Sequence, residues 1–152
     1  MIVDEAERTR RRRLVQAHMD AENAHDLEAI LATFAPRSSN SLNLIPFENP
    51  SPQVVRDIHT LLGFGPEPGA LADTRGIPQR EHFTDKAIVI EGEVIGRHVG
   101  DFFGMPPSNQ LITLPYVAIY TFDQTDKLAS ERVVMDTSRF GQVIIARKGA
   151  QP

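Results

Sequence analysis

The feature that most constrains this chain is a pair of apolar segments joined by a short polar link. The first segment runs from Leu111 to Phe122 and the second from Lys127 to Asp136, and both are rich in β-branched and aromatic residues. The link at 123–126 reads Asp-Gln-Thr-Asp. This pattern predicts a long antiparallel hairpin. The preceding stretch, 101–109, contains Gly-Met-Pro-Pro and predicts a sharp corner that introduces the hairpin.

The N-terminal third of the chain carries three amphipathic helical patterns. The first helix begins at Asp4 and breaks at 23–25, the second is capped by Asp26 and stopped by Pro36, and the third begins at Ser51-Pro52 and ends at Gly63. Their apolar faces are predicted to be Leu14, Ala17, His18 and Ala21; Leu27, Ile30, Leu31 and Phe34; and Val54, Val55, Ile58, Leu61 and Leu62.

Further strands are predicted on both sides of the third helix. We expect a short strand within 38–47, a surface loop over 63–80 and one long strand over 84–99 with a bulge at Gly92. The tail at 143–145 is apolar and predicts a short final piece. Helices followed by a run of strands predict an α+β fold in which the helices cover one face of a curved antiparallel sheet.

The composition fits a single domain of a water-soluble protein. The chain has 152 residues, of which 41% are hydrophobic and 24% charged. A net charge of −4 argues against nucleic acid as a partner. The absence of cysteine, of an apolar run of roughly 20 residues and of a signal peptide predicts a cytoplasmic protein with no membrane partner. The histidines lack metal-ligand spacing, and no glycine-rich phosphate loop follows a strand, so we expect neither metal nor cofactor.

Three segments resemble the SnoaL-like polyketide cyclases of the nuclear transport factor 2-like superfamily. They are 21–35 (AENAHDLEAILATFA), 91–107 (EGEVIGRHVGDFFGMPP) and 127–136 (KLASERVVMD). The resemblance implies a cone-shaped α+β barrel that encloses an apolar pocket between helices and sheet. It also implies a homodimer built on the sheet, and a small apolar molecule as the ligand.

Asp136 is the first candidate for a catalytic residue. The resemblance places the general acid/base of these cyclases at this position. The residue also follows Val133-Val134-Met135, a run typical of a buried strand. A carboxyl group in an apolar pocket has a raised pKa and can transfer protons near neutral pH. The alternative is an aspartate that closes the strand and caps the turn at 137–138.

Other candidates follow from position in the predicted elements. His98, near a strand end, and His18, on the apolar face of the first helix, are candidates for polarising a substrate carbonyl, although both are also compatible with core packing. Tyr116 and Tyr120 share one strand face, where the cyclases carry a histidine. The candidate substrate-binding residues are Tyr116, Tyr120, Phe102 and Arg132.

Three functions remain open on these observations. The first is a cofactor-free enzyme that acts on an apolar carbonyl compound by acid/base catalysis, as in intramolecular aldol ring closure or double-bond isomerisation. The second is a non-catalytic module for ligand binding or dimerisation on the same fold. The third is epoxide hydrolysis by an Asp-Arg-Asp arrangement, which requires Arg132 and Asp136 to converge with another carboxylate.

Overall fold

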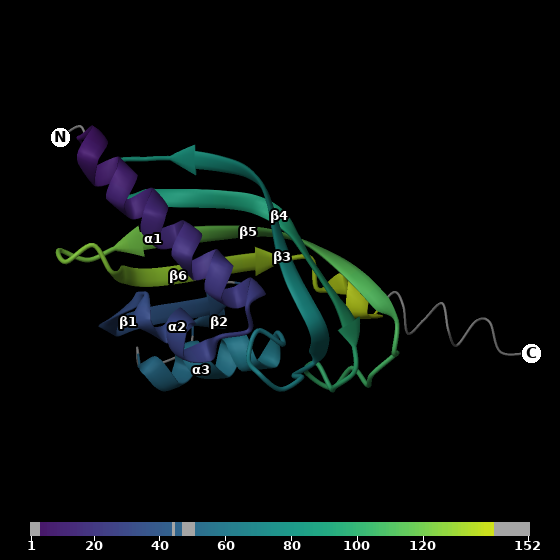
Figure 1. The fold of residues 1–152 in the computed structure, drawn as a ribbon. Coiled ribbons are helices and arrows are strands. Elements are labelled where there is room, and N and C mark those ends of the chain that lie inside the picture. Colours follow the sequence, from purple (N-terminus) through teal and green to yellow (C-terminus); the bar gives the residue numbers. More distant parts are fainter. Residues whose placement is uncertain (1–3, 44, 47–50, 142–152) are drawn as a thin grey trace, which may run out of the picture.

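The computed structural model describes residues 4–43, 45–46 and 51–141 (Figure 1). The helices of this part of the chain precede most of the strands. In chain order the elements are α1 (Glu5–Asn23), α2 (Leu27–Ala32), β1 (Phe34–Leu42), β2 (Ile45–Pro46), α3 (Pro52–Leu61), β3 (Leu71–Phe83), β4 (Ala87–His98), β5 (Leu111–Phe122) and β6 (Leu128–Met135). The predicted piece at 143–145 lies outside the described residues.

The three helices begin where the sequence predicts. Asp4, Asp26 and Ser51 each accept a hydrogen bond from the backbone N–H three residues later, which satisfies a donor that has no partner inside the helix. The predicted end of the second helix is wrong. The helix stops at Ala32, and Phe34 instead starts β1, where it pairs with Leu128 of β6.

The strands form one curved, open sheet in the order β2-β1-β6-β5-β4-β3. The predicted hairpin is confirmed as β5 and β6, and the predicted long strand is confirmed as β4. The sheet is not wholly antiparallel, because β1 runs parallel to β6. Pro115 immediately precedes Tyr116 in β5, and the pairing of β5 with β6 stops at Tyr116. At that point β5 has become an edge strand, where a missing N–H is tolerated.

The predicted loop over 63–80 is wrong in its second half, because β3 already begins at Leu71 and pairs with β4 along most of its length. It forms the edge of the sheet, which explains how it contains Gly76 and Pro78. The register shift next to Gly92 arises in β3, between Pro78 and Arg80, rather than in β4.

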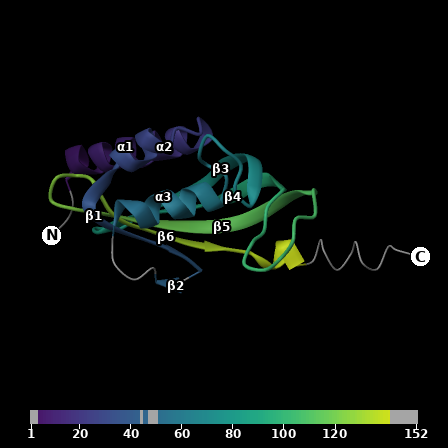
Figure 2. The ribbon, with the colours of Figure 1, turned by 90° about the horizontal axis from the view of Figure 1, so that it is seen from below.

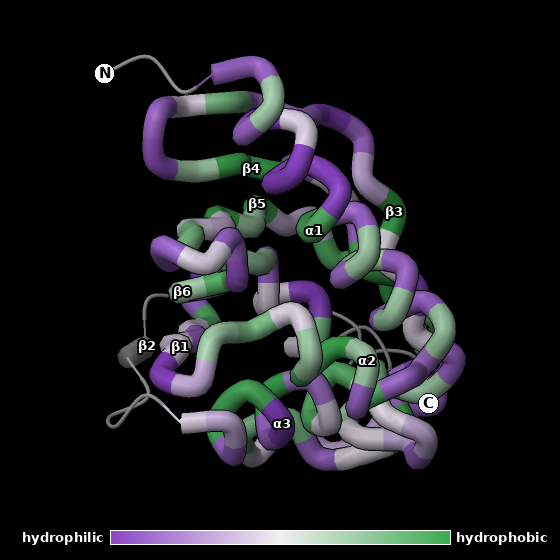
Figure 3. The backbone as a smooth tube through the Cα atoms, turned by 60° about the vertical axis from the view of Figure 1, so that its left-hand side comes forward, coloured by the Kyte–Doolittle hydropathy of each residue, from purple (hydrophilic) through white to green (hydrophobic). Residues whose placement is uncertain are grey.

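The helices cover one face of the sheet, and the core lies between the two layers (Figure 2). Hydrophobic stretches of β4 and β5 lie beneath the helices (Figure 3). The buried side chains at the centre of this layer include Ile30, Val55, Ile58, Ile90, Leu114 and Tyr120. The structure therefore confirms the α+β cone-like fold, with an open sheet in place of a closed barrel. None of the helices in the described ranges is long and apolar enough to cross a membrane.

Candidate functional site

Asp136 lies outside the space between helices and sheet. Its side chain is 41% exposed, and its carboxylate accepts hydrogen bonds from the backbone N–H and the hydroxyl of Ser138. These hydrogen bonds and Arg139 lower the pKa of Asp136. The expected burial and raised pKa are therefore wrong, and the geometry is that of the capping alternative. Arg132 is also exposed, on the same outer face, so the pair does not line the interior as epoxide chemistry requires.

His98 and Phe102 are buried, but in a different part of the core. His98 Nδ1 lies 3.3 Å from the hydroxyl of Ser108, and its ring packs edge-on against Phe140. Phe102 stacks on Phe140 as well, and the centroids of the two rings lie 4.0 Å apart. Burial lowers the pKa of His98. Both residues fit the packing role that the sequence left open.

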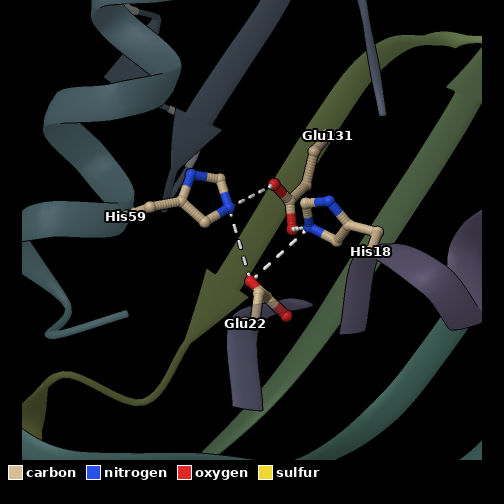
Figure 4. Close-up of side chains that lie close together, drawn as sticks. All are labelled: His18, Glu22, His59 and Glu131. Carbon is tan, nitrogen blue, oxygen red and sulfur yellow. Dashed lines mark ion pairs between the residues drawn. The ribbon is translucent and has the colours of Figure 1, made fainter. Parts of the chain in front are cut away.

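Four ionisable side chains meet instead beneath the helices, and we call them the His–Glu cluster: His18 and Glu22 of α1, His59 of α3 and Glu131 of β6 (Figure 4). His18 Nε2 lies 3.5 Å from Glu22 Oε1 and 3.6 Å from Glu131 Oε1. His59 Nε2 lies 3.4 Å from an oxygen of each carboxylate. The side chains are 0 to 12% exposed, so the cluster is part of the interior.

Hydrogen bonds outside the cluster fix the orientation of both imidazole rings. Thr33 donates its hydroxyl hydrogen to the carbonyl of Ile30, so its oxygen is left to accept from His18 Nδ1 at 3.0 Å. His59 Nδ1 lies 2.7 Å from the carbonyl of Val55, which can only accept. Both Nδ1 atoms therefore carry hydrogen, and both Nε2 atoms face the carboxylates.

The carboxylates are held as firmly as the rings. Glu131 Oε2 accepts a hydrogen bond from Asn40 Nδ2 on the neighbouring strand, at 3.0 Å. Glu22 lies one helical turn after His18, so α1 presents both side chains to the same point. Groups outside the cluster thus hold three of its four residues, and Glu22 is positioned by α1.

The charges of the cluster stabilise one another. Burial alone would lower the pKa of His18, but Glu22 and Glu131 outweigh it and raise the pKa to about 9. The same opposition raises the pKa of His59 to about 10. Burial would raise the pKa of both carboxylates, yet the two histidines lower them. At neutral pH the metal-free cluster is therefore two imidazolium ions facing two carboxylates.

A small cavity adjoins the cluster. Its free volume is about 30 Å³, enough for about one water molecule. Three cluster residues, Glu22, His59 and Glu131, form its polar end. Apolar side chains of α3, β4 and β6 form most of the remaining wall, together with Tyr116 and Tyr120. Burial raises the pKa of both tyrosines, and the nearby carboxylates raise it further, so the hydroxyl groups stay protonated.

The structure brings together three of the residues proposed from sequence, His18, Tyr116 and Tyr120, but the sequence analysis missed the other members of the cluster. Signals for two of them exist. Glu22 follows His18 at a spacing of four residues, and His59 follows Ile58 on the apolar face of α3. Glu131 has no such signal, because the run after it is apolar on both faces. The structure buries Val133 and Met135, and this alternation places Glu131 on the inner face of β6.

Comparison with known proteins identifies the class of fold. No protein-family model and no curated protein sequence matches the chain. A candidate SnoaL-like polyketide cyclase from Jannaschia sp. CCS1 superposes with a TM-score of 0.75 at 16% identity, over 95% of this chain and 94% of that one. TsrD from Streptomyces laurentii gives 0.74 at 15%, over 93% and 97%. The epoxide hydrolase/cyclase-like enzyme SalBIII gives 0.69 at 14%, over 87% and 95%.

These similarities define an NTF2-like α+β fold. Within that class the structure resembles the SnoaL-like polyketide cyclases, as the three sequence segments predict. At identities of 18% or less in these matches, the likeness concerns the fold, and the chemistry has to be argued from the site itself.

Proposed function

We propose that the protein is an enzyme that transfers a proton on a small, mostly apolar carbonyl compound, and that the His–Glu cluster is its catalytic centre. One observation carries this proposal: a charged, pre-oriented acid/base cluster forms the inner end of an apolar cavity. Structural neighbours that include polyketide cyclases and an epoxide hydrolase/cyclase-like enzyme support the same class of chemistry.

The residues divide naturally into proton acceptors and donors. Glu22 and Glu131 are ionised and line the cavity, so either is placed to take a proton from a carbon next to a carbonyl group. The histidines lower the pKa of both carboxylates, so their assignment as base rests on position and not on a raised pKa. Tyr116 and Tyr120 retain their protons and are placed to donate hydrogen bonds to the carbonyl oxygen, where negative charge develops. His59 as imidazolium is then placed to donate a proton to the substrate, and the protonated glutamate passes its proton to His59 Nε2, which restores the starting state. This moves the acid/base role from Asp136 to the interior.

The cavity is smaller than a usual substrate pocket. About 30 Å³ holds no carbonyl compound of several carbons, because ligand pockets usually measure about 300–1,000 Å³. Substrate binding therefore requires the wall formed by Ile58, Leu62 and Phe64 to move away from the sheet. The small volume favours a second candidate function, a non-catalytic module in which the cluster only stabilises the fold.

A homodimer built on the sheet and a cytoplasmic location stay predictions from the sequence.

Exchange of carbon-bound hydrogen tests the proposal without knowledge of the natural substrate. A panel of small cyclic and linear ketones is incubated with the protein in D2O, and NMR follows the loss of signals from hydrogens next to the carbonyl. We expect catalysed exchange for at least one ketone, lowered in folded Glu131→Gln and retained in Asp136→Asn. Exchange that depends on Asp136 and survives Glu131→Gln would restore the original assignment. No exchange with any ketone would favour the non-catalytic module.

A further inference from the structure

The His–Glu cluster has the donor set of a transition-metal site. It offers two imidazole nitrogens and two carboxylates, and one ligand atom from each residue lies within 4.8 Å of all the others. Imidazole and carboxylate ligands together suit zinc and its neighbours in the first transition row, whereas Mg²⁺ and Ca²⁺ prefer oxygen alone. The sequence hints only at the pair on α1, His18 and Glu22, because the other two ligands come from separate elements.

The separations between nitrogen and oxygen match a shared ion better than direct hydrogen bonds. They measure 3.4 to 3.6 Å, and His18 Nε2 is buried without a hydrogen-bond partner among the described residues. A good N–H···O contact spans about 2.7–3.2 Å. Two ligands on one tetrahedral ion, with bonds of about 2.0–2.1 Å, lie about 3.3–3.4 Å apart. These four separations are thus slightly too wide for hydrogen bonding and close to those across a central ion.

The surroundings of the cluster also fit a metal site. Metal-binding histidines usually donate their other ring N–H to a nearby oxygen, which fixes the tautomer and aims the free nitrogen. Thr33 and the Val55 carbonyl receive these hydrogens here, and Asn40 supports Glu131 in the same way. Each imidazole can therefore present the lone pair of Nε2 to the centre of the cluster once its second proton leaves.

Charge and space are consistent with an ion and one further ligand. A divalent cation exchanges for the two Nε2 protons, so the cluster stays neutral overall, with two carboxylates and two neutral imidazoles. The adjoining cavity of about 30 Å³ has room for about one water molecule beside Glu22, His59 and Glu131. With four protein ligands a tetrahedral ion is already fully coordinated, as in closed structural zinc sites, so the water would be a fifth ligand.

We propose that His18, Glu22, His59 and Glu131 bind one divalent transition-metal ion, with Zn²⁺ as the preferred occupant. The proposal goes beyond the proposed function, because the ion can bind whether or not the cavity accepts a carbonyl substrate. A bound ion would occupy the carboxylates and imidazoles that the acid/base mechanism uses, so the metal-bound and protonated clusters are alternative states. With the ion bound, its positive charge would take the place of the two ring protons at the polar end of the cavity.

Equilibrium binding of Zn²⁺ to the untagged full chain tests the proposal. The protein is stripped with a chelator and titrated by isothermal calorimetry, and the metal that survives dialysis is counted by mass spectrometry. We expect one Zn²⁺ per chain, a rise in melting temperature with Zn²⁺, and no comparable effect of Mg²⁺. His59→Gln should weaken binding by roughly 100-fold or more, since even outer-shell changes cost about 10–100-fold.

A matched control comes from the surface. His82 and Glu91 also form a His–Glu pair, at 2.5 Å, but both are exposed and stand apart from the cluster. His82→Gln should bind Zn²⁺ like the wild type. Substoichiometric, easily dialysed Zn²⁺ in the folded wild type, or full binding in folded His59→Gln, would overturn the proposal.

If His59→Gln fails to fold, Co²⁺ bound to the wild type gives the answer. Intense visible absorption, displaced by one equivalent of Zn²⁺, supports a tetrahedral site with nitrogen ligands. Only the weak spectrum of hydrated Co²⁺ would overturn it. Neither of these metal-binding measurements uses a ketone, so failure of metal binding and failure of ketone exchange are separate results.

Discussion

Removing one carboxylate from the His–Glu cluster should be far more costly than removing one from the surface. In Glu131→Gln the side chain keeps its shape, but His18 and His59 then share a single carboxylate, that of Glu22. One buried imidazolium must stay unpaired or lose its proton. Deprotonating His18 at pH 7, against a pKa of about 9, costs about 3 kcal/mol. This agrees with the roughly 3–5 kcal/mol typical of breaking a buried ion pair.

Urea unfolding followed by circular dichroism, with chelator present throughout, measures this difference. We expect the free energy of unfolding of Glu131→Gln to fall by about 3 kcal/mol at pH 7, with an unchanged dependence on urea. The difference should shrink above pH 10, where the wild-type histidines lose their protons. Glu81→Gln is the control, because Glu81 pairs with Arg12 at the surface and such pairs contribute about 0–1 kcal/mol.

A free energy of unfolding of Glu131→Gln within about 1 kcal/mol of the wild type, the range of a surface pair, would refute a charged cluster. The cluster would then be a set of neutral side chains without a net electrostatic contribution. A large loss in Glu81→Gln as well would point to a general sensitivity to lost carboxylates. The first result is incompatible with two charged histidines inside the protein, and the second would remove the link between the loss in Glu131→Gln and the cluster.

Three further outcomes are expected. In the chelated protein, the raised pKa values of His18 and His59 should give their full contribution to stability below about pH 6.5. This contribution should disappear as the pH rises through about 9 and 10, and melting temperatures measured across the pH range will show the loss. Asp136→Asn should leave the melting temperature nearly unchanged, because the residue is exposed and only caps Ser138. Gly63→Ala should destabilise by about 3 kcal/mol or more, measured by urea unfolding, because φ is +77° and a Cβ would lie 2.2 Å from the first carbonyl oxygen of β3.

The elements set by local signals were predictable from the sequence. Helix caps at Asp4, Asp26 and Ser51 mark the helix starts, and alternating apolar runs mark β4, β5 and β6. The parallel pairing of β1 with β6 was not predictable from the sequence. It joins residues about 90 positions apart and depends on how the whole sheet assembles. For the same reason β3 was missed: its glycine and proline resemble a loop until an edge position is known.

The candidate site shows a different limit. Val133, Val134 and Met135 are all apolar, so the sequence does not reveal which of them points inward. The structure turns Val133 and Met135 to the core, which places Glu131 inside and Asp136 outside. An error of one residue in assigning the inner face of the strand therefore predicted Asp136 inside the core in place of Glu131. Convergence of helices on this strand is a tertiary effect that no spacing along the chain encodes.

The position of β6 also has a consequence for how the chain folds during synthesis. Although β6 follows the other five strands in the described sequence, it lies in the middle of the sheet, between β1 and β5. Until the ribosome has released it, β1 and β5 each expose an unpaired edge, and His18 and His59 lack one of their two carboxylate partners. Long-range pairing of this kind slows folding and leaves edges open to association with other chains. We therefore expect chains that end before Leu128 to aggregate, and completion of the sheet and of the cluster to be one late, shared step.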